Sequence, residues 1–412
     1  MALPGDAAAD PDGFVETGVY ALGGSFLFLL DIPGARRLYL DADGSLSAVF
    51  EPATGRAAST AGVLLSAQAY AARFRRKLYA HLNVLRDGWF PAGLTAHEGV
   101  TRLLVNHCLD FDRMTQARHW PKAQIPITGD PQAACARIMA STRATIDALR
   151  RTGPARMTLT AGNETRMLLA ACRDIATELE FVTVSGPSTR LDCDRARELA
   201  ARFGLKLRLL PIRHADAAGA AEWHARAGHC IGGPNMVTHP TIAPLAGPGW
   251  FIGGLGGEIG RGFFWRPTDT GDTEITAQSI QSRFGMPPHP EVEAAVAAWR
   301  PSIDGFDPFL QLDLAYLELR MGCWAFAQSY ASPEVRHMHP MISRESFAAM
   351  LSLPPDWRRS HRMVRASIEA AWPELLELPI NRYGDWRDAL RLLARAAAEP
   401  HLVLKKLRKR FG

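Results

Sequence analysis

The feature that most constrains the fold is a regular alternation of apolar runs and amphipathic segments between residues 131 and 211. In the first segment apolar residues recur every three or four positions, Asp130 supplies a helix start and Gly153-Pro154 supplies the stop. The segments that follow are expected as strands 157–160, 181–185 and 207–211 and as helices 164–178 and 193–203. Strands separated by helices of this length predict right-handed βαβ units on a parallel sheet.

The residues on either side of this alternation predict a different organisation. Before it, short apolar runs at 19–22, 26–30, 37–40 and 48–50 are separated by turns, a helix is expected over 67–84, and 120–131 has the composition of a linker. After it, we expect a strand at 250–253 and a largely helical region beyond residue 291. We therefore predict an α/β protein with an antiparallel β-rich domain, residues 1–121, and a parallel-sheet domain with a helical C-terminal part, residues 122–412.

Composition narrows the classes of function. The net charge is only +5 and arginine far outnumbers lysine, which we interpret as a coding bias rather than as a nucleic-acid-binding surface. Six cysteines without a CxxC pair predict reduced, mostly buried thiols. The N-terminus lacks the features of a secretory signal, and the apolar run 19–32 is too short and interrupted to cross a membrane. We expect a cytoplasmic protein that binds neither nucleic acid nor membrane.

One basic patch is concentrated at residues 405–410, close to the C-terminus. It could contact phosphate or a membrane, but a solvated helix end with cations near its negative pole is the favoured interpretation.

A first candidate for a ligand site is the junction between the strand at 157–160 and the helix after it. Here Gly162 lets the backbone approach an anion closely, and the helix start offers N–H groups to phosphate. Thr160 and Thr165 supply hydroxyls, Arg166 a positive charge and Glu164 an oxygen ligand for Mg²⁺. One glycine at such a junction is also compatible with a purely structural turn.

A second candidate is the run from Ile252 to Gly262, which contains six glycines. So many glycines cost backbone entropy, and they are easier to explain in a loop that passes close to a ligand than by packing alone. Glu258 and Arg261 are its charged groups. A flexible loop after a strand is the alternative.

Together the two elements resemble the asparagine synthase family of ATP pyrophosphatases. Thr160-Ala161-Gly162-Asn163-Glu164-Thr165 stands where the family has a Ser-Gly-Gly-x-Asp-Ser phosphate loop. Gly254-Leu255-Gly256-Gly257-Glu258 stands where the family has a Gly-Glu-Gly-x-Asp loop. Upstream, Leu22-Gly23-Gly24-Ser25-Phe26 and Asp41-Ala42-Asp43-Gly44 look like the family's glutaminase half.

The resemblance implies an adenine-nucleotide-binding domain with ATP and Mg²⁺ as cofactors. A substrate carboxylate, from a small molecule or a peptide, would be adenylated and then attacked by an amine. The residues expected to contact the nucleotide are Thr160, Ala161, Gly162, Asn163, Thr165, Val184, Ser185, Gly254, Gly256 and Gly257. Glu164 and Glu258 would hold the metal, and Arg166, Arg261 and Arg382 are the candidate catalytic cations. A homodimer is also compatible with this interpretation.

Several positions depart from the family pattern. Ala2 stands where a glutaminase needs a cysteine, so we expect no glutamine hydrolysis. Glutamates replace both metal aspartates, and Leu255 replaces the glutamate of the second loop. No lysine occurs between residues 207 and 395, so Arg382 is the nearest substitute for the family's late lysine, although it is a poorer proton donor.

Histidines add little to the functional hypotheses. His337 and His339 are expected in a loop or on the surface, and His224 and His229 are not expected to bind metal. Two functions remain open: an ATP-dependent amide ligase that does not use glutamine, and a nucleotide-binding or scaffold protein that has kept the fold and lost the reaction.

Overall fold

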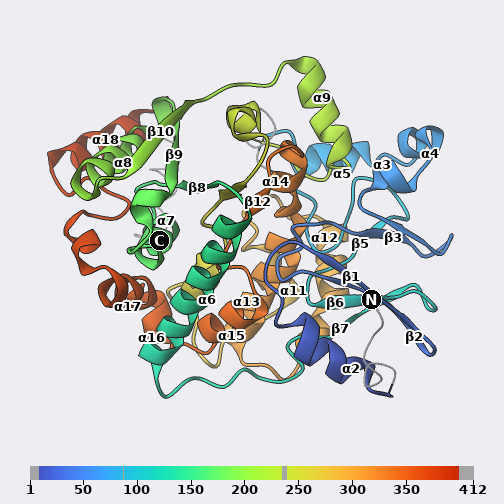
Figure 1. Ribbon diagram of the computed structural model, residues 1–412. Helices are drawn as coiled ribbons and strands as arrows, with labels where there is room; N and C mark the ends of the chain where they lie inside the picture. The colour runs from blue at the N-terminus through green and yellow to red at the C-terminus, as the bar shows by residue number, and fades with distance from the viewer. Residues whose placement is uncertain (1–8, 87, 234–238, 399–412) are drawn as a thin grey trace.

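The computed structural model describes residues 9–86, 88–233 and 239–398. It is a mixed α/β structure with antiparallel sheets near the N-terminus and a five-stranded parallel sheet (Figure 1). In this view the antiparallel strands lie to the right, and strands β8, β9 and β10 lie to the upper left. The predicted fold class is therefore confirmed.

The N-terminal part contains two antiparallel sheets. One has the strand order β1-β2-β6-β7 and the other β4-β3-β5. The strands are β1 (Leu27–Ile32), β2 (Ala35–Leu40), β3 (Val49–Glu51), β4 (Arg56–Ala58), β5 (Thr101–Arg102), β6 (His107–Asp110) and β7 (Thr115–Arg118). The two-residue turn at Pro33 and Gly34, whose glycine has φ +82°, sets the register of the first hairpin, in which Ile32 pairs with Ala35.

Two predicted elements of this part are wrong in detail. The run 19–22 is not a strand, because Val15–Val19 forms a π-helical turn whose two valines pack into a small apolar cluster. The helix expected over 67–84 is divided into α4 (Ala67–Ala72) and α5 (Arg76–His81). The break lies at Phe74, whose backbone forms a bridge to His97 instead of continuing the helix.

The parallel sheet has the order β10-β9-β8-β11-β12, so the chain reverses its direction of growth between β8 and β11. Its strands are β8 (Ala155–Thr158), β9 (Glu180–Ser185), β10 (Lys206–Pro211), β11 (Trp250–Ile252) and β12 (His337–Met338). The first four match predicted strands to within about two residues. The fifth, β12, was expected as a loop, and it pairs with β11 through Phe251 and Ile252.

The helices beside this sheet follow the predicted alternation. The long helix α6 (Pro131–Thr152) is capped by Asp130, whose carboxylate accepts the Ala133 N–H at 2.9 Å, and it ends at Gly153. It is followed by α7 (Asn163–Ala171) and α8 (Arg190–Phe203). The helix predicted over 164–178 is too long, because α7 ends at Ala171 and a turn follows it. The main C-terminal helices are α12 (Pro290–Trp299), α13 (Pro308–Leu319), α15 (Arg344–Leu351), α17 (Arg362–Ala371) and α18 (Trp386–Ala398).

Further helices connect these elements. They are α2 (Pro11–Phe14), α3 (Ala61–Leu64), α9 (Ala217–Arg226), α11 (Ala277–Gln281), α14 (Phe326–Ala331) and α16 (Pro355–Arg359), with 3-10 turns such as η5 (Gly257–Arg261), η6 (Arg300–Ile303) and η8 (Pro373–Glu377).

One apolar core joins the N-terminal and C-terminal parts. Phe90 and Leu104 belong to the same buried cluster as Ile138 and Leu317. A backbone hydrogen bond also joins the two parts, since the Phe90 N–H donates to the Cys230 carbonyl at 2.9 Å. The domain boundary at residues 121–122 therefore stays a prediction, because the two parts share a core.

All six cysteines are free and buried, which confirms the prediction from their spacing. Within the described ranges, no helix has both the length and the apolarity needed to span a bilayer.

Candidate functional site

A pocket of about 720 Å³ opens at the carboxyl ends of the parallel strands, around the reversal between β8 and β11. Open α/β sheets bind ligands at this position, because the loops diverge there and leave a crevice. Its volume lies in the range of about 300–1,000 Å³ that is usual for cofactor sites. Each of the five strands, or the loop that follows it, contributes to the wall. The lining residues include Thr158, Thr160, Val184, Ser188, Thr189, Ile212, Gly253, Gly254, His337 and His339.

The loop after β8 is closed by its own hydrogen bonds. The Gly162 N–H donates to Thr160 Oγ1 at 3.0 Å, and the Thr160 N–H donates to Thr165 Oγ1 at 3.2 Å. The Ala161 N–H donates to the Asp192 carboxylate at 2.9 Å. The backbone donors left for a ligand are therefore the N–H groups of the first turn of α7, which have no intrahelical acceptor and lie at the positive end of the helix dipole.

The glycine-rich loop after β11 lies directly against this helix end. A Cβ atom on Gly254 would be 2.9 Å from Glu164 Cβ and 3.3 Å from the Thr165 backbone nitrogen. A Cβ atom on Gly257 would be 2.8 Å from Glu164 Cγ. These glycines are needed because the two loops touch, and the contact brings the two sequence motifs into one site.

The charged groups of the pocket are organised around Glu164. Arg261 forms an ion pair with the Glu164 carboxylate, and each side chain is about one-fifth exposed. Glu258 lies deeper, where Tyr316 donates its hydroxyl to Oε1 at 3.1 Å and the Gly256 N–H donates to Oε2 at 3.0 Å. Burial raises the pKa of the Glu258 carboxyl, and the negative charge of Glu164 adds to the effect.

This arrangement fits a nucleotide better than it fits a metal ion. The threonine hydroxyls and the start of α7 are suitable partners for phosphate oxygens. Mg²⁺ needs ionised, unpaired carboxylates, whereas Glu164 is paired with Arg261 and burial raises the pKa of the Glu258 carboxyl. Within the described part of the chain, no group of three or more His, Cys, Asp or Glu side chains has metal-binding geometry.

Two histidines line the pocket, contrary to the prediction of a loop or surface position. His337 belongs to β12 and His339 follows it. His339 Nδ1 accepts the Leu255 N–H at 3.4 Å, which leaves Nε2 as the donor to Gln328 Oε1 at 2.9 Å. Burial lowers the pKa of both histidines to about 4, so both are neutral at neutral pH.

Most of the predicted site residues lie at or directly behind this wall. Those that line the pocket are Thr160, Glu164, Thr165, Val184, Gly254, Glu258 and Arg261. Ala161, Gly162, Asn163, Gly256 and Gly257 belong to the same two loops but do not form its surface. Ser185 ends β9 without lining the pocket, and Ser188 and Thr189, which sequence reasoning missed, line it instead.

Arg166 is not brought to the pocket. Its side chain is fully buried, and its Nη1 donates to the carbonyls of Leu375 and Leu378 at 2.6 and 3.0 Å. Burial lowers the pKa of its guanidinium to about 10. This candidate catalytic cation therefore has a structural role instead, since it links α7 to η8 and to the residue that follows η8.

Arg382 lies close to the phosphate loop but on the surface. Its neighbour Asn381 donates its backbone N–H to the Ala161 carbonyl at 2.7 Å, which joins the two segments. The Arg382 side chain is exposed and does not line the pocket.

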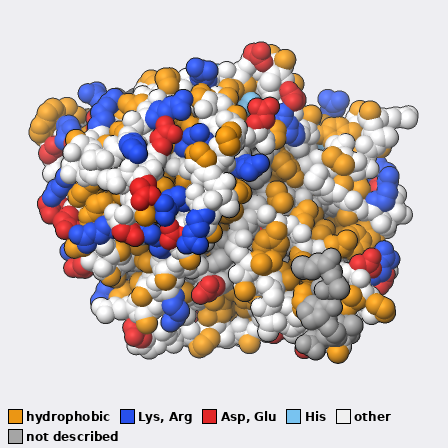
Figure 2. Space-filling model, in the orientation of Figure 1, with side chains coloured by type: hydrophobic (Ala, Val, Ile, Leu, Met, Phe, Trp, Pro, Cys, Tyr) orange, Lys and Arg blue, Asp and Glu red, His pale blue; other side chains and the backbone are white. Residues whose placement is uncertain are grey.

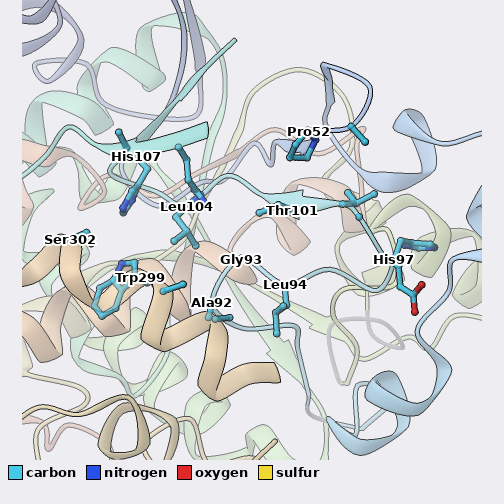
Figure 3. Close-up of a pocket in the computed structure, with 18 of the residues that line it drawn as sticks. Pro52, Ala92, Gly93, Leu94, His97, Thr101, Leu104, His107, Trp299 and Ser302 are labelled. Atoms are coloured by element: carbon cyan, nitrogen blue, oxygen red, sulfur yellow. The ribbon is translucent and has the colours of Figure 1, made fainter. Parts of the chain in front are cut away.

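A second cavity of about 750 Å³ lies between the N-terminal strands and α12 (Figure 3). Trp299 and Ser302 face Leu104 and His107 across it. The Arg118 in its wall is already held by the Glu318 carboxylate at 2.6 and 2.7 Å. Arg118 here and Arg261 in the pocket at the parallel sheet are both paired with a glutamate, but only the pocket at the parallel sheet also includes the start of a helix, α7, so it is the better candidate for an anionic ligand.

No family model matches the chain, and no curated protein matches it.

Proposed function

We propose that the protein binds ATP in the pocket at the parallel sheet and uses it to activate a carboxylate for amide-bond formation. The observation that carries this proposal is the meeting of the two loops after β8 and β11 in one pocket at the reversal of strand order. The sequence resemblance to asparagine synthases gives these loops the roles of phosphate loop and partner. The position of the pocket agrees with that of nucleotide sites in open α/β sheets.

In this proposal each wall of the pocket has a separate task. Val184, with Ser188 and Thr189, forms the wall at the end of β9 that receives the adenine. The hydroxyls of Thr160 and Thr165 and the first N–H groups of α7 receive the phosphates. Arg261 is the only Arg or Lys among the described residues that line the pocket, so it is the group that can offset phosphate charge.

The reaction has two balanced steps. A carboxylate oxygen of the substrate attacks the α-phosphorus of ATP, and pyrophosphate leaves with the electrons of the broken P–O bond. An amine nitrogen then attacks the carbonyl carbon of the acyl-adenylate, and AMP leaves as the amine loses a proton. Fixed donors aimed at the developing phosphate charge are the main catalytic contribution that such a site can make.

A second candidate function, nucleotide binding without catalysis, is favoured by a different observation. The ion pair between Arg261 and Glu164 leaves the site without a ready metal-binding carboxylate. The sequence also lacks a lysine between residues 207 and 395. A protein of this kind would bind ATP and release no pyrophosphate with any carboxylate.

Calorimetric titration of the full chain with ATP, with and without Mg²⁺, tests the shared part of both proposals. The variant Glu258→Ala should weaken binding, whereas Glu222→Ala, whose exposed side chain lies on α9, should leave it unchanged. Exchange of labelled pyrophosphate into ATP, screened over carboxylates, then separates ligase from binder. The absence of ATP binding would exclude both functions.

The six buried, free thiols support a reducing compartment, and we therefore propose the cytoplasm as the location.

A further inference from the structure

The helix α18 carries an apolar stripe that faces solvent. Trp386, Leu390 and Leu393 are 70%, 54% and 66% exposed. Their spacing of four and three residues places them on one face of the helix. The other exposed large apolar side chains of the described residues occur singly or, on β1, as the pair Leu27 and Leu29.

The sequence of this helix and of the residues after it is rich in positive charge. Arg387, Arg391 and Arg395 follow one another at four-residue steps, and residues 399–412, which lie outside the described residues, contain five Lys and Arg and one Glu. The two aspartates at the start of the helix are already engaged. Asp388 accepts the backbone N–H groups of Tyr383 and Gly384 at 2.8 Å each, and Asp385 pairs with Arg387.

Hydrogen bonds to α8 hold the residues just before α18 in place. Arg195 of α8 donates to the carbonyls of Arg382 and Tyr383 at 2.9 and 3.2 Å. The Tyr383 hydroxyl donates to the Asp194 carboxylate at 3.0 Å. The space-filling view shows hydrophobic side chains among basic and acidic ones at the left edge of the molecule, where α18 is drawn in Figure 1 (Figure 2). The stripe therefore has a fixed position at the periphery.

We propose that this face of α18 docks on a membrane surface that contains anionic lipids. In such a complex Trp386, Leu390 and Leu393 lie among the lipid headgroups and upper acyl chains, and the arginines contact lipid phosphates. Helices with aromatic and aliphatic residues on one face and cations on the other bind lipid interfaces in this way. The apolar stripe beside these cations favours this partner over the solvated helix end that residues 405–410, which lie outside the described residues, suggest by themselves. The proposal therefore replaces the expectation from the sequence alone that the protein binds no membrane.

Charge also argues against two other partners. A second copy of the chain would bring cations against cations, because the net charge is +5 and the sequence 386–412 contains eight Lys and Arg against two Asp and Glu. A nucleic acid would offer phosphates to the arginines but would leave the apolar stripe in water. A surface of anionic lipids offers phosphates to the arginines and an apolar environment to the stripe. The proposal is independent of the nucleotide site.

Co-sedimentation of the full chain with vesicles tests the proposal. One set of vesicles contains phosphatidylcholine alone and the other also contains phosphatidylglycerol. We expect binding to the anionic vesicles only. Binding should weaken at high salt, because salt screens the electrostatic attraction between the arginines and the lipid phosphates. The triple variant Trp386→Gln, Leu390→Gln, Leu393→Gln should reduce binding by about tenfold or more, since it removes the inserted apolar area.

The matched control is the triple variant Leu29→Gln, Val63→Gln, Leu85→Gln, which changes three other exposed apolar side chains and should bind as the unaltered protein does. Thermal unfolding of both variants checks that they are folded. Equal binding by the stripe variant, or no preference for anionic vesicles, would overturn the proposal. A dimer in sedimentation velocity would also overturn the proposal if the stripe variant, but not the control variant, were a monomer. A second copy of the chain would then cover the stripe.

Discussion

The guanidinium of Arg261 is paired with the carboxylate of Glu164, so a catalytic candidate and a metal candidate neutralise each other in one ion pair. Both residues line the pocket, and Glu164 stands at the positive end of α7. The pair thus occupies the position where the phosphates of a nucleotide would lie. A ligand that binds there has to compete with Glu164 for Arg261.

We predict that Arg261→Gln weakens ATP binding by about tenfold or more, since a charge-assisted hydrogen bond contributes about 1.5–3 kcal/mol. Arg261→Lys should retain part of the affinity, because it keeps the charge and loses the forked geometry. Calorimetric titration measures both effects. Arg113→Gln, on an exposed turn between β6 and β7, is the control. Unchanged affinity in Arg261→Gln would place the phosphates elsewhere.

The contact between the two loops leads to a second prediction. A methyl group on Gly254 would meet backbone as well as side chain of the α7 start, so Gly254→Ala should push the loops apart. We expect a loss of stability of about 1–3 kcal/mol, typical of overpacking, together with weaker ATP binding. Urea unfolding and calorimetry measure the two quantities. Gly271→Ala, at a position with open space around it, should change neither.

The sequence predicts the parts of this fold whose signals are local. From α6 to β10 the hydrophobic period changes with each element, and the structure follows it closely. The meeting of the two loops could also be expected, since both follow strands of one parallel sheet and the carboxyl ends of such strands lie at one edge. The pairing of Arg261 with Glu164 could not, because no local pattern records which side chain of one loop meets which of the other.

Other features escape prediction because tertiary contacts decide them. The strand β12 has two residues, too few to show a period, and only its pairing with Phe251 and Ile252 makes it a strand. That pairing is also what brings His337 and His339 to the pocket. Arg166 lies on the buried side of α7, and a charged residue next to a phosphate loop gives no sequence signal that it points into the core.

A buried ion pair is hydrogen-bonded to the backbone of the glycine-rich loop. Arg358 binds the Asp313 carboxylate at 2.6 and 2.8 Å and donates to the Ile259 carbonyl at 2.6 Å. Asp313→Leu would leave the arginine charge buried without a partner, and we predict a loss of about 3–5 kcal/mol in the free energy of unfolding. Urea unfolding should show that the double variant Asp313→Leu, Arg358→Leu is less destabilised than Asp313→Leu. A double variant as unstable as the sum of the two single variants would argue against a coupled pair.

Three histidines, the buried His97 and His224 and the half-buried His229, form a cluster between the N-terminal part and the C-terminal end of α9. His224 and His229 stack with ring centroids 5.5 Å apart, and the Tyr70 hydroxyl lies 2.6 Å from His229 Nδ1. Neither ring nitrogen of His97 or His224 has a hydrogen-bond partner among the described residues. Burial lowers the pKa of His97 and of His224 to about 4.

This cluster predicts a loss of stability in acid. Because the folded pKa of about 4 lies below the unfolded value of about 6.5, the unfolded chain binds more protons between these two pH values. The stabilising contribution is complete above pH 6.5 or so and is lost as the pH falls toward 4. The variant His97→Gln, His224→Gln should therefore lose several degrees less in melting temperature between neutral pH and pH 5 than the unaltered protein. His214→Gln, at an exposed position, should retain the full dependence. If the double variant loses as much as the unaltered protein, groups other than these histidines control unfolding in acid.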